Sequence, residues 1–409
     1  MDTDQEKDCV IIVHCGAGNH SIKNKKIFKK LIINSLNLTI NNIDTNNNNN
    51  NESETIDDLN NSYIYNSFKS YLDKFIKICC NIESSELTNT GYGSSINNIG
   101  KIECDSSIII HDFNNKIFQS TVVNLSYNYP ILKCLNDLII SNCKKIPKFG
   151  LTPFLFKSYL NSNEYNQYDL ITKRQKKNYE LYQLYLLKEQ EDEDEEKDLA
   201  NGLIPAVIEN PVSDTVGVSM ILDDGRMITG TSSGGNLFKD SGRIGCAGVI
   251  GSGIYSNISS DGIKITVMCS GNGEDIIQMG LSRNIYEYLI LHKDEFINQT
   301  TDKLTCDLIS EKCFEMSSKV YLRGGVDVTH NTNLYIGVIC YIEYTYVDDD
   351  DEEVEKRQNS LESRKVKLLS YFHTTENFVF GFKYHGKTEF KFSSLANGKK
   401  SNRGEIYIS

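Results

Sequence analysis

The sequence predicts a layered α+β domain, and three observations support this fold class. Hydrophobic residues make up 39% of the 409 residues, which is enough for a sizeable core. Helix-like segments come first, strand-like segments follow, and both kinds recur toward the C-terminus, so the order does not match alternating βαβ units. The sequence Asp223-Asp-Gly-Arg separates two strand-like runs and is typical of a hairpin turn.

The first half of the chain begins with a short apolar run, Cys9–His14, which predicts a buried strand. The sequence Cys15-Gly-Ala-Gly after it predicts a glycine-rich turn. Apolar residues at helical spacing follow, then two strand-like runs, then a polar helix rich in Tyr and Leu. We expect helices at Ile27–Leu38, at Tyr63–Cys80 and at about 166–188, and paired strands at Ile102–His111 and Lys116–Leu125.

The second half of the chain is richer in strand-like segments. Two of its segments have apolar residues at helical spacing, Gly273–His292 and Thr301–Lys319. The expected strands are Thr215–Leu222, Met227–Ser232, Ile244–Ile250, Lys264–Met268, Leu334–Tyr341, Val366–Phe372 and Phe378–Tyr384.

Three low-complexity segments are too polar to be buried. Asn46–Asn51 is a polyasparagine run, while Glu189–Asp198 and Asp348–Lys356 are dense acidic runs. We interpret them as solvated insertions or flexible segments, at about 41–60, 189–210 and 347–364.

The charge balance and the N-terminus narrow the classes of function. There are 43 Lys and Arg against 55 Asp and Glu, a net charge of −12, so nothing draws the chain to a nucleic-acid backbone. The polar start, Met1-Asp-Thr-Asp-Gln-Glu-Lys, does not resemble a signal peptide, and no apolar run is long enough to span a membrane. The twelve cysteines form no CxxC pair and predict reduced thiols. We expect no metal, no cofactor and no membrane or nucleic-acid partner.

The segment Pro211-Val-Ser-Asp-Thr-Val-Gly-Val carries the candidate chemistry. If the bond between Asp214 and Thr215 is cut, Thr215 gains an α-amine beside its own hydroxyl. Such an amine has a pKa of about 8 and can take the hydroxyl proton near neutral pH. One residue then supplies both nucleophile and base. Alone this pattern is weak, because most such tetrapeptides simply begin a strand.

Other segments strengthen the interpretation. Thr231-Ser-Ser-Gly-Gly lies on the return strand of the predicted hairpin and would bring Ser233 near Thr215. Gly242-Arg-Ile-Gly contains Arg243, whose guanidinium can bind a carboxylate through two nitrogens. Ser270-Gly-Asn-Gly-Glu, between a strand and a helix, can stabilise an oxyanion. Asn89-Thr-Gly-Tyr-Gly is a further turn that exposes backbone.

Taken together, these segments resemble the threonine aspartases, or taspases, of the plant-type asparaginase superfamily of N-terminal-nucleophile (Ntn) hydrolases. The resemblance covers most of the chain outside the insertions. It implies a four-layer αββα sandwich, formed jointly by the fragments 1–214 and 215–409 as one structural domain. The segments that carry it are Val13-His-Cys-Gly-Ala-Gly-Asn-His-Ser, Thr88-Asn-Thr-Gly-Tyr-Gly-Ser, Gly100-Lys-Ile-Glu-Cys-Asp-Ser-Ser-Ile, Ser232-Ser-Gly-Gly, Gly242-Arg-Ile-Gly and His373-Thr-Thr-Glu.

The resemblance implies a role for each candidate residue of the reaction. Thr215 would be the nucleophile and, through its new amine, the base. Ser233 would orient that amine and hydroxyl. Ser270 and Gly271 would form the oxyanion hole, with Asn89 as a further donor.

The resemblance also implies the substrate contacts. Arg243 would bind the side chain of an Asp at P1, the residue before the cut bond, through a bidentate charge-assisted pair. Asp214 would be the P1 residue of the chain's own cleavage. Gly16 and Gly18 would shape the loop beside the precursor bond. The main expectation is therefore a threonine endopeptidase that cuts proteins after Asp.

Cys246 distinguishes the expected endopeptidase from an asparaginase or isoaspartyl peptidase of the same fold. Asparaginases of the superfamily have Asp at this position, where it holds the α-amine of a free amino-acid substrate, and taspases usually have an amide. A thiol supplies no such charge. An isoaspartyl peptidase or L-asparaginase of the same fold remains the first alternative. An uncleaved binding protein that uses its acidic insertions as an interaction surface is the second.

The resemblance also suggests partners and a location. The two fragments would stay associated, because the first alone lacks half of the core strands, and two such units would form an αββα heterotetramer. The basic cluster Lys173-Arg-Gln-Lys-Lys is either a solvated helix face or a nuclear import signal. We expect a cytoplasmic or nuclear protein.

Overall fold

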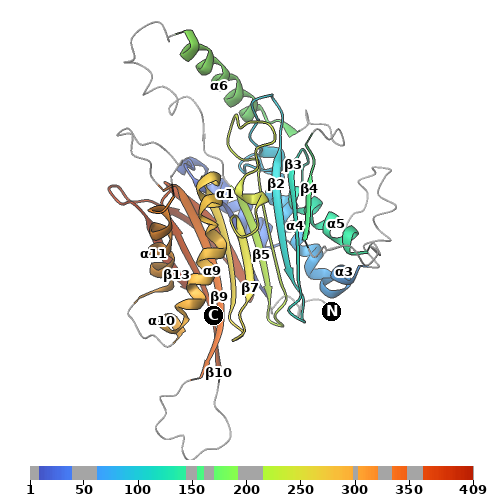
Figure 1. The fold of residues 1–409 in the computed structure, drawn as a ribbon, viewed down its shortest axis with the longest axis vertical. Helices are drawn as coiled ribbons and strands as arrows, with labels where there is room; N and C mark the ends of the chain where they lie inside the picture. Colours follow the sequence, from blue (N-terminus) through green and yellow to red (C-terminus); the bar gives the residue numbers. More distant parts are fainter. Residues whose placement is uncertain are drawn as a thin grey trace, which may run out of the picture.

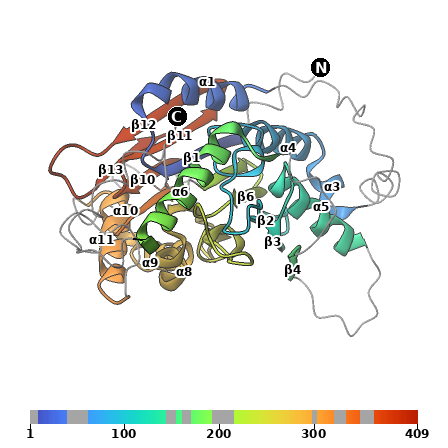
Figure 2. The same cartoon turned by 90° about the horizontal axis from the view of Figure 1, so that it is seen from above.

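Two β-sheets stack face to face, and helices cover both outer faces (Figures 1 and 2). The computed structural model describes residues 9–38, 62–143, 154–160, 170–191, 215–297, 303–320, 334–347 and 363–408. In Figure 1, α9 and α11 lie on one side of the sheets and α4 and α5 lie on the other. This arrangement confirms the expected four-layer αββα sandwich.

The larger sheet has eight strands in the order β12-β11-β1-β5-β6-β2-β3-β4. All its neighbours are antiparallel except β3 and β4. Its strands are β1 (Cys9–Gly18), β2 (Cys104–His111), β3 (Ile117–Leu125), β4 (Phe154–Ser158), β5 (Val216–Leu222), β6 (Met227–Ser233), β11 (Asn377–Tyr384) and β12 (Lys387–Ser394).

The smaller sheet is antiparallel and has five strands in the order β13-β10-β9-β8-β7. Its strands are β7 (Ile254–Ile258), β8 (Lys264–Gly271), β9 (Ile336–Val347), β10 (Ser363–His373) and β13 (Asn402–Tyr407).

The helices divide between the two outer faces. The larger sheet is covered by α1 (Lys25–Leu36), α3 (Tyr63–Phe68), α4 (Ser70–Glu83) and α5 (Pro130–Cys143). The smaller sheet is covered by α8 (Gly273–Met279), α9 (Leu281–Leu291), α10 (Lys293–Ile297) and α11 (Thr305–Ser317). Helix α6 (Lys173–Glu191) extends from one end of the sandwich (Figures 1 and 2). Short 3-10 helices occur at η2 (Ile22–Asn24), η3 (Gly91–Gly93) and η6 (Cys246–Gly248).

The alternation of side chains along β1 shows how one strand supplies two cores. Ile11 and Val13 point to the helices on the outer face, whereas Val10 and Ile12 point to the second sheet. All four are buried, because this strand lies inside the larger sheet and between two apolar layers. The apolar run at the start of the chain is therefore continuous rather than alternating.

Three segments differ from the expected elements. The helix expected at Tyr63–Cys80 is broken at Lys69, whose φ is 42°, and the one expected at Gly273–His292 is broken at Gly280, where φ is 51°. The strand expected at Ile244–Ile250 is wrong, because residues 246–248 form a 3-10 helix instead. The backbone N–H of Gly245 donates to the buried Asp105 carboxylate and so takes no part in a strand ladder. Strands β4, β7, β12 and β13 and helices α5 and α10 are not among the expected elements.

Several sequence features lie outside the described residues. They include Asp214, the polyasparagine run, most of the acidic run 189–198 and all of the acidic run 348–356. Across the part of the chain that the structure describes, no helix is long and apolar enough to cross a membrane.

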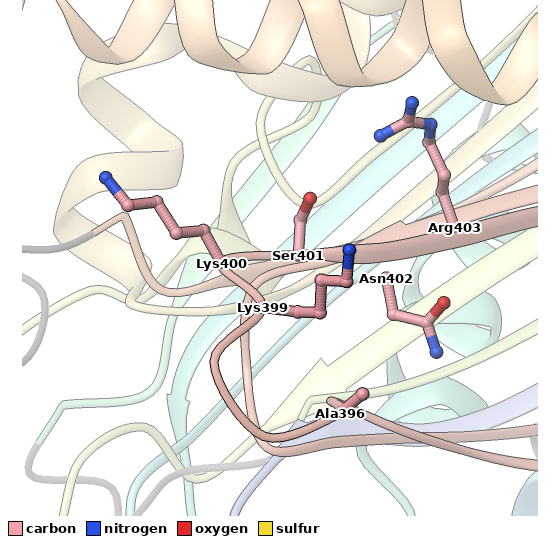
Figure 3. A pocket seen from close by; sticks show the side chains of 6 residues that line it. All are labelled: Ala396, Lys399, Lys400, Ser401, Asn402 and Arg403. Atoms are coloured by element: carbon pink, nitrogen blue, oxygen red, sulfur yellow. The ribbon is translucent and has the colours of Figure 1, made fainter.

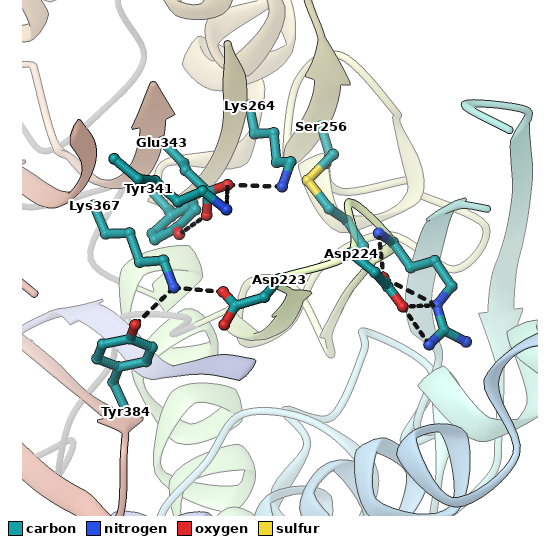
Figure 4. A network of polar contacts seen from close by, with 11 residues as sticks. Asp223, Asp224, Ser256, Lys264, Tyr341, Glu343, Lys367 and Tyr384 are labelled. Carbon is teal, nitrogen blue, oxygen red and sulfur yellow. Dashed lines mark hydrogen bonds and ion pairs between the residues drawn. The ribbon is translucent and has the colours of Figure 1, made fainter. Parts of the chain in front are cut away.

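The turn between β5 and β6 lies beside a network of paired charges (Figure 4). Lys264 Nζ lies 2.7 Å from Glu343 Oε1, and Tyr341 donates to Glu343 Oε2 at 2.8 Å. Lys367 bridges Asp223 at 2.5 Å and the Tyr384 hydroxyl at 2.8 Å. The expected hairpin turn is thus confirmed, and the ion pair between Asp223 and Lys367 connects it to the smaller sheet.

Candidate active site

Thr215 lies at the end of the β5–β6 hairpin opposite this turn, immediately before β5. It is 2% exposed. Its backbone nitrogen donates to Ser270 Oγ at 3.3 Å, and the same hydroxyl accepts the backbone N–H of Ala17 at 2.9 Å. Because Ser270 is the next-to-last residue of β8 and Ala17 the next-to-last residue of β1, one hydroxyl connects both sheets beside Thr215. Asp214, the other side of the predicted cut bond, lies outside the described residues.

Ser233 comes to Thr215 through the register of the hairpin. Val216 pairs with Ser232, so the next residue of β6 faces Thr215 across the ladder. The Ser233 hydroxyl accepts the backbone N–H of Gly235 at 3.1 Å. The register of the return strand therefore places Ser233 opposite the candidate nucleophile, while its role in orienting Thr215 stays a prediction.

Asn89 holds the turn that follows Ser233. Its side-chain amide donates to the Gly235 carbonyl at 2.8 Å, and its side-chain oxygen accepts the Ser95 N–H at 2.7 Å. Its backbone carbonyl accepts the Gly234 N–H at 2.7 Å. These bonds make Asn89 a support of the glycine turn, while its role as an oxyanion donor stays a prediction.

Gly271 forms the turn between β8 and α8. Its φ is 123°, and a Cβ there would lie 2.3 Å from the Tyr335 carbonyl oxygen, so only glycine fits. The Asn272 N–H donates to that same carbonyl at 2.8 Å, and the Asn272 side chain caps α8. The expected backbone-exposing turn thus lies directly after Ser270.

Gly16 interrupts β1 close to the same place. Its φ is 101°, and the register of β1 against β11 shifts between His14 and Ala17. Gly18 continues the strand opposite Asn377. This bulge brings the N–H of Ala17 to Ser270, consistent with glycines that shape the loop beside the nucleophile.

Arg243 lies among three glycines. A Cβ at Gly235 or Gly245 would come within 2.7 or 2.8 Å of its Nη1, and one at Gly273 within 2.9 Å of its Nη2. Glu274 binds the other edge of the guanidinium, with its Oε1 2.7 Å from Nε and 2.5 Å from Nη2. The cation is thus fixed in position, but one edge of its fork is already taken by a carboxylate.

Cys246 lies between Arg243 and Thr215. It is 3% exposed at the start of η6. Burial raises the pKa of its thiol to about 11, although the Arg243 charge and a contact with the Thr215 side chain act in the opposite direction. The thiol is therefore neutral near pH 7, and this position offers no negative charge to a substrate.

Residues of the first half of the chain form hydrogen bonds with the segment that precedes Arg243. Glu103 accepts Ser241 Oγ–H at 2.7 Å and the Gly242 N–H at 2.8 Å. Asn98 binds the same segment through the Asp240 carboxylate and the Ser241 N–H. Residues from both sides of the predicted cut therefore position the arginine.

Three charged residues of this site were not among the sequence candidates. Lys239, 6% exposed, donates from Nζ to the Glu103 carbonyl at 2.5 Å. Asp105 is fully buried and accepts the N–H groups of Gly245 and Asn124. Glu274 is the partner of Arg243. Of these, Asp105 had a signal in the sequence, since a carboxylate inside a strand-like apolar run needs a specific reason.

His14 and Glu83 are buried ionisable groups next to the site. Burial lowers the pKa of His14 to about 3, opposed by a contact with the Thr215 backbone. Its ring fills the space beside Gly217, where a Cβ would lie 2.3 Å from Nε2. Glu83 Oε1 accepts the Ser232 hydroxyl at 2.6 Å. Both groups pack on the strands that carry the candidate nucleophile.

The structure brings the candidates together at one end of the sandwich. Thr215 contacts Ser270 and Cys246, Cys246 is close to Arg243, and the strand register places Ser233 opposite Thr215. Within the described residues, no three His, Cys, Asp or Glu side chains form a group that could hold a metal ion. The cysteines whose side chains are described are all free thiols.

Two surface hollows lie apart from this cluster. One, of about 370 Å³, is lined by residues of the segment that connects β12 to β13, among them the exposed Lys399 and Lys400 (Figure 3). Arg403 beside them is paired with Asp307. The other, of about 610 Å³, lies between α6 and Phe238. Neither includes Thr215.

Comparison with known proteins gives one family. The sequence model of the family described as Asparaginase matches residues 27–307. A plant-type L-asparaginase of Thermococcus kodakarensis is 24% identical over 280 residues, covering 67% of this chain and 82% of that protein.

Animal relatives match shorter stretches. An isoaspartyl peptidase/L-asparaginase of Xenopus laevis is 27% identical over 231 residues, which is 52% of this chain and 60% of that protein. A probable isoaspartyl peptidase/L-asparaginase of Drosophila pseudoobscura pseudoobscura is 30% identical over 143 residues, which is 34% of this chain and 40% of that protein. The chain thus spans less than two thirds of the length of these two relatives.

Proposed function

The chain belongs to the asparaginase family of Ntn hydrolases, and we propose that within this family it is a threonine endopeptidase that cleaves polypeptides after Asp. It would first cut its own Asp214–Thr215 bond. The observation that carries the proposal is Cys246. A neutral, buried thiol beside Arg243 supports a substrate that presents a carboxylate but no free α-amine. The Asp side chain of a polypeptide fits that description.

The proposed reaction uses Thr215 as nucleophile and base. Its free α-amine takes the proton of its own hydroxyl, and the oxygen attacks the backbone carbonyl carbon of the P1 Asp. The Gly271 N–H lies in the turn where it can stabilise the oxyanion, and Ser270 already holds the Thr215 nitrogen. The peptide C–N bond breaks, and the leaving amine takes the proton. Water then hydrolyses the ester and restores the threonine.

The strand order supports association of the two fragments. Residues 1–214 contribute β1, β2, β3 and β4 to the larger sheet, and residues 215–409 insert β5 and β6 between β1 and β2. A fragment that separated would expose both edges of this gap. We propose that the fragments stay joined after cleavage.

The second candidate function is hydrolysis of isoaspartyl peptides or L-asparagine. The names of the relatives favour it, since each is called an L-asparaginase or an isoaspartyl peptidase/L-asparaginase. The same nucleophile and oxyanion turn would serve that reaction. Its substrates carry a free α-amine, for which position 246 supplies no charge, so we place this function second.

Self-cleavage tests the nucleophile. Mass spectrometry of the purified full chain should show two fragments, the second beginning at Thr215. The Thr215→Ala variant should remain one chain and be inactive. Thr229→Ala is a matched control, because Thr229 is a buried threonine in the middle of the same hairpin. A Thr215→Ala chain that still splits at this bond would show that another group is the nucleophile.

Substrate choice separates the two candidate functions. We expect cleavage of the peptide Pro-Val-Ser-Asp-Thr-Val-Gly-Val, the chain's own residues 211–218, after its Asp. Ammonia release from L-asparagine and cleavage of a β-aspartyl dipeptide should be slower by kcat/KM. A protein that hydrolyses only the two small substrates would replace the endopeptidase by the second candidate.

A further inference from the structure

Glu274 is the polar partner that holds the Arg243 guanidinium in place. Its Oε1 accepts from Nε at 2.7 Å and lies 2.5 Å from Nη2. Among the described residues, no other group forms a hydrogen bond or an ion pair with this guanidinium. Its other neighbours are glycines, since a Cβ on Gly235, Gly245 or Gly273 would lie 2.7, 2.8 or 2.9 Å from Nη1 or Nη2. One carboxylate therefore sets the direction of the whole cation.

This contact leaves the fork that a substrate needs. A guanidinium binds carboxylates along its side edge, formed by Nε and one terminal nitrogen, or along its end edge, formed by Nη1 and Nη2. Glu274 Oε1 occupies the side edge of Arg243. The end edge keeps one N–H from each terminal nitrogen. A substrate carboxylate can therefore still bind there with both oxygens, as the sequence predicts.

Glu274 also connects Arg243 to the turn that is expected to stabilise the oxyanion. It lies three residues after Gly271, in the first turn of α8. Gly271 is the last residue of β8, and the Asn272 side chain caps α8 by accepting the Asp275 N–H at 3.1 Å. Because a strand and a capped helix hold this short segment, the backbone sets the separation between the Arg243 fork and the Gly271 N–H.

That separation bears on the length of the P1 side chain. In the proposed reaction, the P1 carbonyl oxygen reaches the Gly271 N–H while the P1 carboxylate reaches Arg243. Asp and Glu differ by one methylene between these two groups, so a fixed fork can suit only one of them. A fork that could turn about its own flexible side chain would also accept the longer residue.

We propose that Glu274 is a positioning residue, which fixes Arg243 at the distance suited to Asp and so sets the preference for Asp over Glu at P1. The inference rests on the proposed function, because the carboxylate concerned is that of a P1 residue. It assigns the choice of side-chain length to a pair of residues, Arg243 and Glu274, whereas the sequence assigns recognition to the arginine alone.

A merely structural role for Glu274 predicts a different result. An acidic residue in the first turn of a helix stabilises that helix, and Glu274 holds this position in α8. Loss of that effect would loosen the turn at Gly271 and slow every substrate alike. Loss of positioning would instead change the ratio between two acidic substrates, because only the reach of the Arg243 fork is altered.

The test is a comparison of two peptides that differ in the length of the P1 side chain. The mature full-length enzyme and its Glu274→Ala variant are assayed on Pro-Val-Ser-Asp-Thr-Val-Gly-Val and on the same peptide with Glu for Asp. We expect kcat/KM for the Asp peptide to fall about 10- to 100-fold, because the fork is no longer held in place. The Asp-to-Glu ratio of kcat/KM should fall about tenfold.

Two further variants serve as controls. The amide oxygen of Glu274→Gln can still accept from Nε and Nη2, so its Asp-to-Glu ratio should stay within about threefold of wild type. Glu287→Ala should change neither rate. It removes a glutamate of α9 that accepts from Nε of Arg283 at 2.8 Å in the same manner, but at an exposed site. Equal losses on both peptides in Glu274→Ala would overturn the proposal.

A measurement on Arg243 itself does not need catalysis. In a full chain with isotope-labelled arginine, the Nε–H signal of Arg243 is identified by its loss in Arg243→Lys. This hydrogen should exchange with water at least about tenfold faster in Glu274→Ala than in wild type, and Glu274→Gln should stay close to wild type. The uncut chain can be used, so a variant that fails to mature is still tested.

The two measurements separate this inference from the proposed function. If wild type cuts neither peptide but the Nε–H exchange behaves as expected, the endopeptidase proposal fails and the positioning of Arg243 by Glu274 stands. If the exchange is the same in wild type and in Glu274→Ala, Glu274 does not position Arg243, and the inference fails even where the Asp peptide is cut.

Discussion

The two ends of the β5–β6 hairpin differ in how their buried charged side chains are paired. At the turn, Lys264, Glu343 and Lys367 each have an oppositely charged partner (Figure 4). At the other end, beside Thr215, Lys239 takes part in no ion pair in the described part of the chain. Glu274 there keeps one buried oxygen without a hydrogen bond. One strand pair thus connects a satisfied polar network to an incomplete one.

This difference indicates that the turn end, where the charges are paired, stabilises the fold, and that the Thr215 end is where a ligand binds. A buried polar group that is fully paired can hold two sheets in register. A buried group with unused donors raises the free energy of the folded chain until something binds to it. Proteins keep such groups mainly where a ligand completes them. The predictions below compare the two ends, beginning with the largest effect.

Two buried glutamates give the sharpest contrast. Burial raises the pKa of Glu83 to about 8, because hydroxyl and amide donors offset only part of the lost hydration. Burial also acts to raise the pKa of Glu343, but the Lys264 ammonium reverses the shift and lowers it. Glu83, at the Thr215 end, is mostly a neutral acid at pH 7, whereas Glu343, at the turn, is an anion.

We predict opposite pH dependence for the two glutamates. The pKa of Glu83 is raised on folding, so its contribution to stability is present below pH 4.5 and is lost as pH rises to about 8. The free energy of unfolding of Glu83→Gln, relative to wild type, should therefore increase by about 1.4 kcal/mol per pH unit across that window. Denaturant unfolding between pH 4 and 9 measures it.

Glu343→Gln is the matched control for this experiment. The pKa of Glu343 is lowered on folding, so its contribution is present above pH 4.5 and is lost as pH falls through its folded-state pKa. The free energy of unfolding of Glu343→Gln should be lower than that of wild type, and this difference should become smaller only at acidic pH. A flat Glu83→Gln difference from pH 4.5 to 8 would mean that Glu83 is not a buried neutral acid.

The second prediction concerns the turn alone. Lys264→Met leaves Glu343 with Tyr341 and with Lys365, which is 3.5 Å away and half-exposed. Removing one member of a buried ion pair should lower the free energy of unfolding by about 3 kcal/mol, measured by denaturant titration. Cleavage per folded molecule should not change, because the pair lies at the opposite end of β8 from Ser270.

An exposed pair provides the control for this variant. Lys293 and Asp261 form an ion pair whose side chains are 34% and 48% exposed, so Lys293→Met should hardly change stability. If Lys264→Met changed the free energy of unfolding equally little, the ion pairs at the turn would not be what stabilises this end of the hairpin. If it abolished cleavage in molecules that remain folded, the two ends would not be independent.

Most of the fold could be predicted from the sequence because its signals are local. The apolar run of β1, the hairpin turn at Asp223 and the strands β2 and β3 follow from periodicity and turn residues. Element breaks were harder, because Lys69 adopts a positive φ that its residue type does not suggest. The short apolar run at 244–250 became a 3-10 helix through a tertiary bond to Asp105, which local patterns do not contain.

Some residues of the candidate site could likewise be predicted from local sequence patterns, and others could not. The residues on the hairpin and in the glycine turns were predicted, because their positions follow from register and motif. Lys239 was not, since a single lysine on a loop is usually solvated, and its burial depends on Glu103 from the other half of the chain. The bond between Arg243 and Glu274 also depends on folding, as it joins the segments before η6 and after β8.

The last prediction adds a charge to the Thr215 end. Cys246→Asp places a carboxylate between Arg243 and Thr215, where the thiol is now neutral. An anion there can hold the α-amine of a free substrate, but it also competes for Arg243 with the substrate carboxylate. We expect hydrolysis of L-asparagine or a β-aspartyl dipeptide to rise about tenfold in kcat/KM, while cleavage of the Asp peptide falls by a similar factor. Cys246→Ser, which is polar but uncharged, is the control and should shift neither. If both Asp and Ser variants lost all activities together, position 246 would serve packing around Thr215 and would not decide substrate choice.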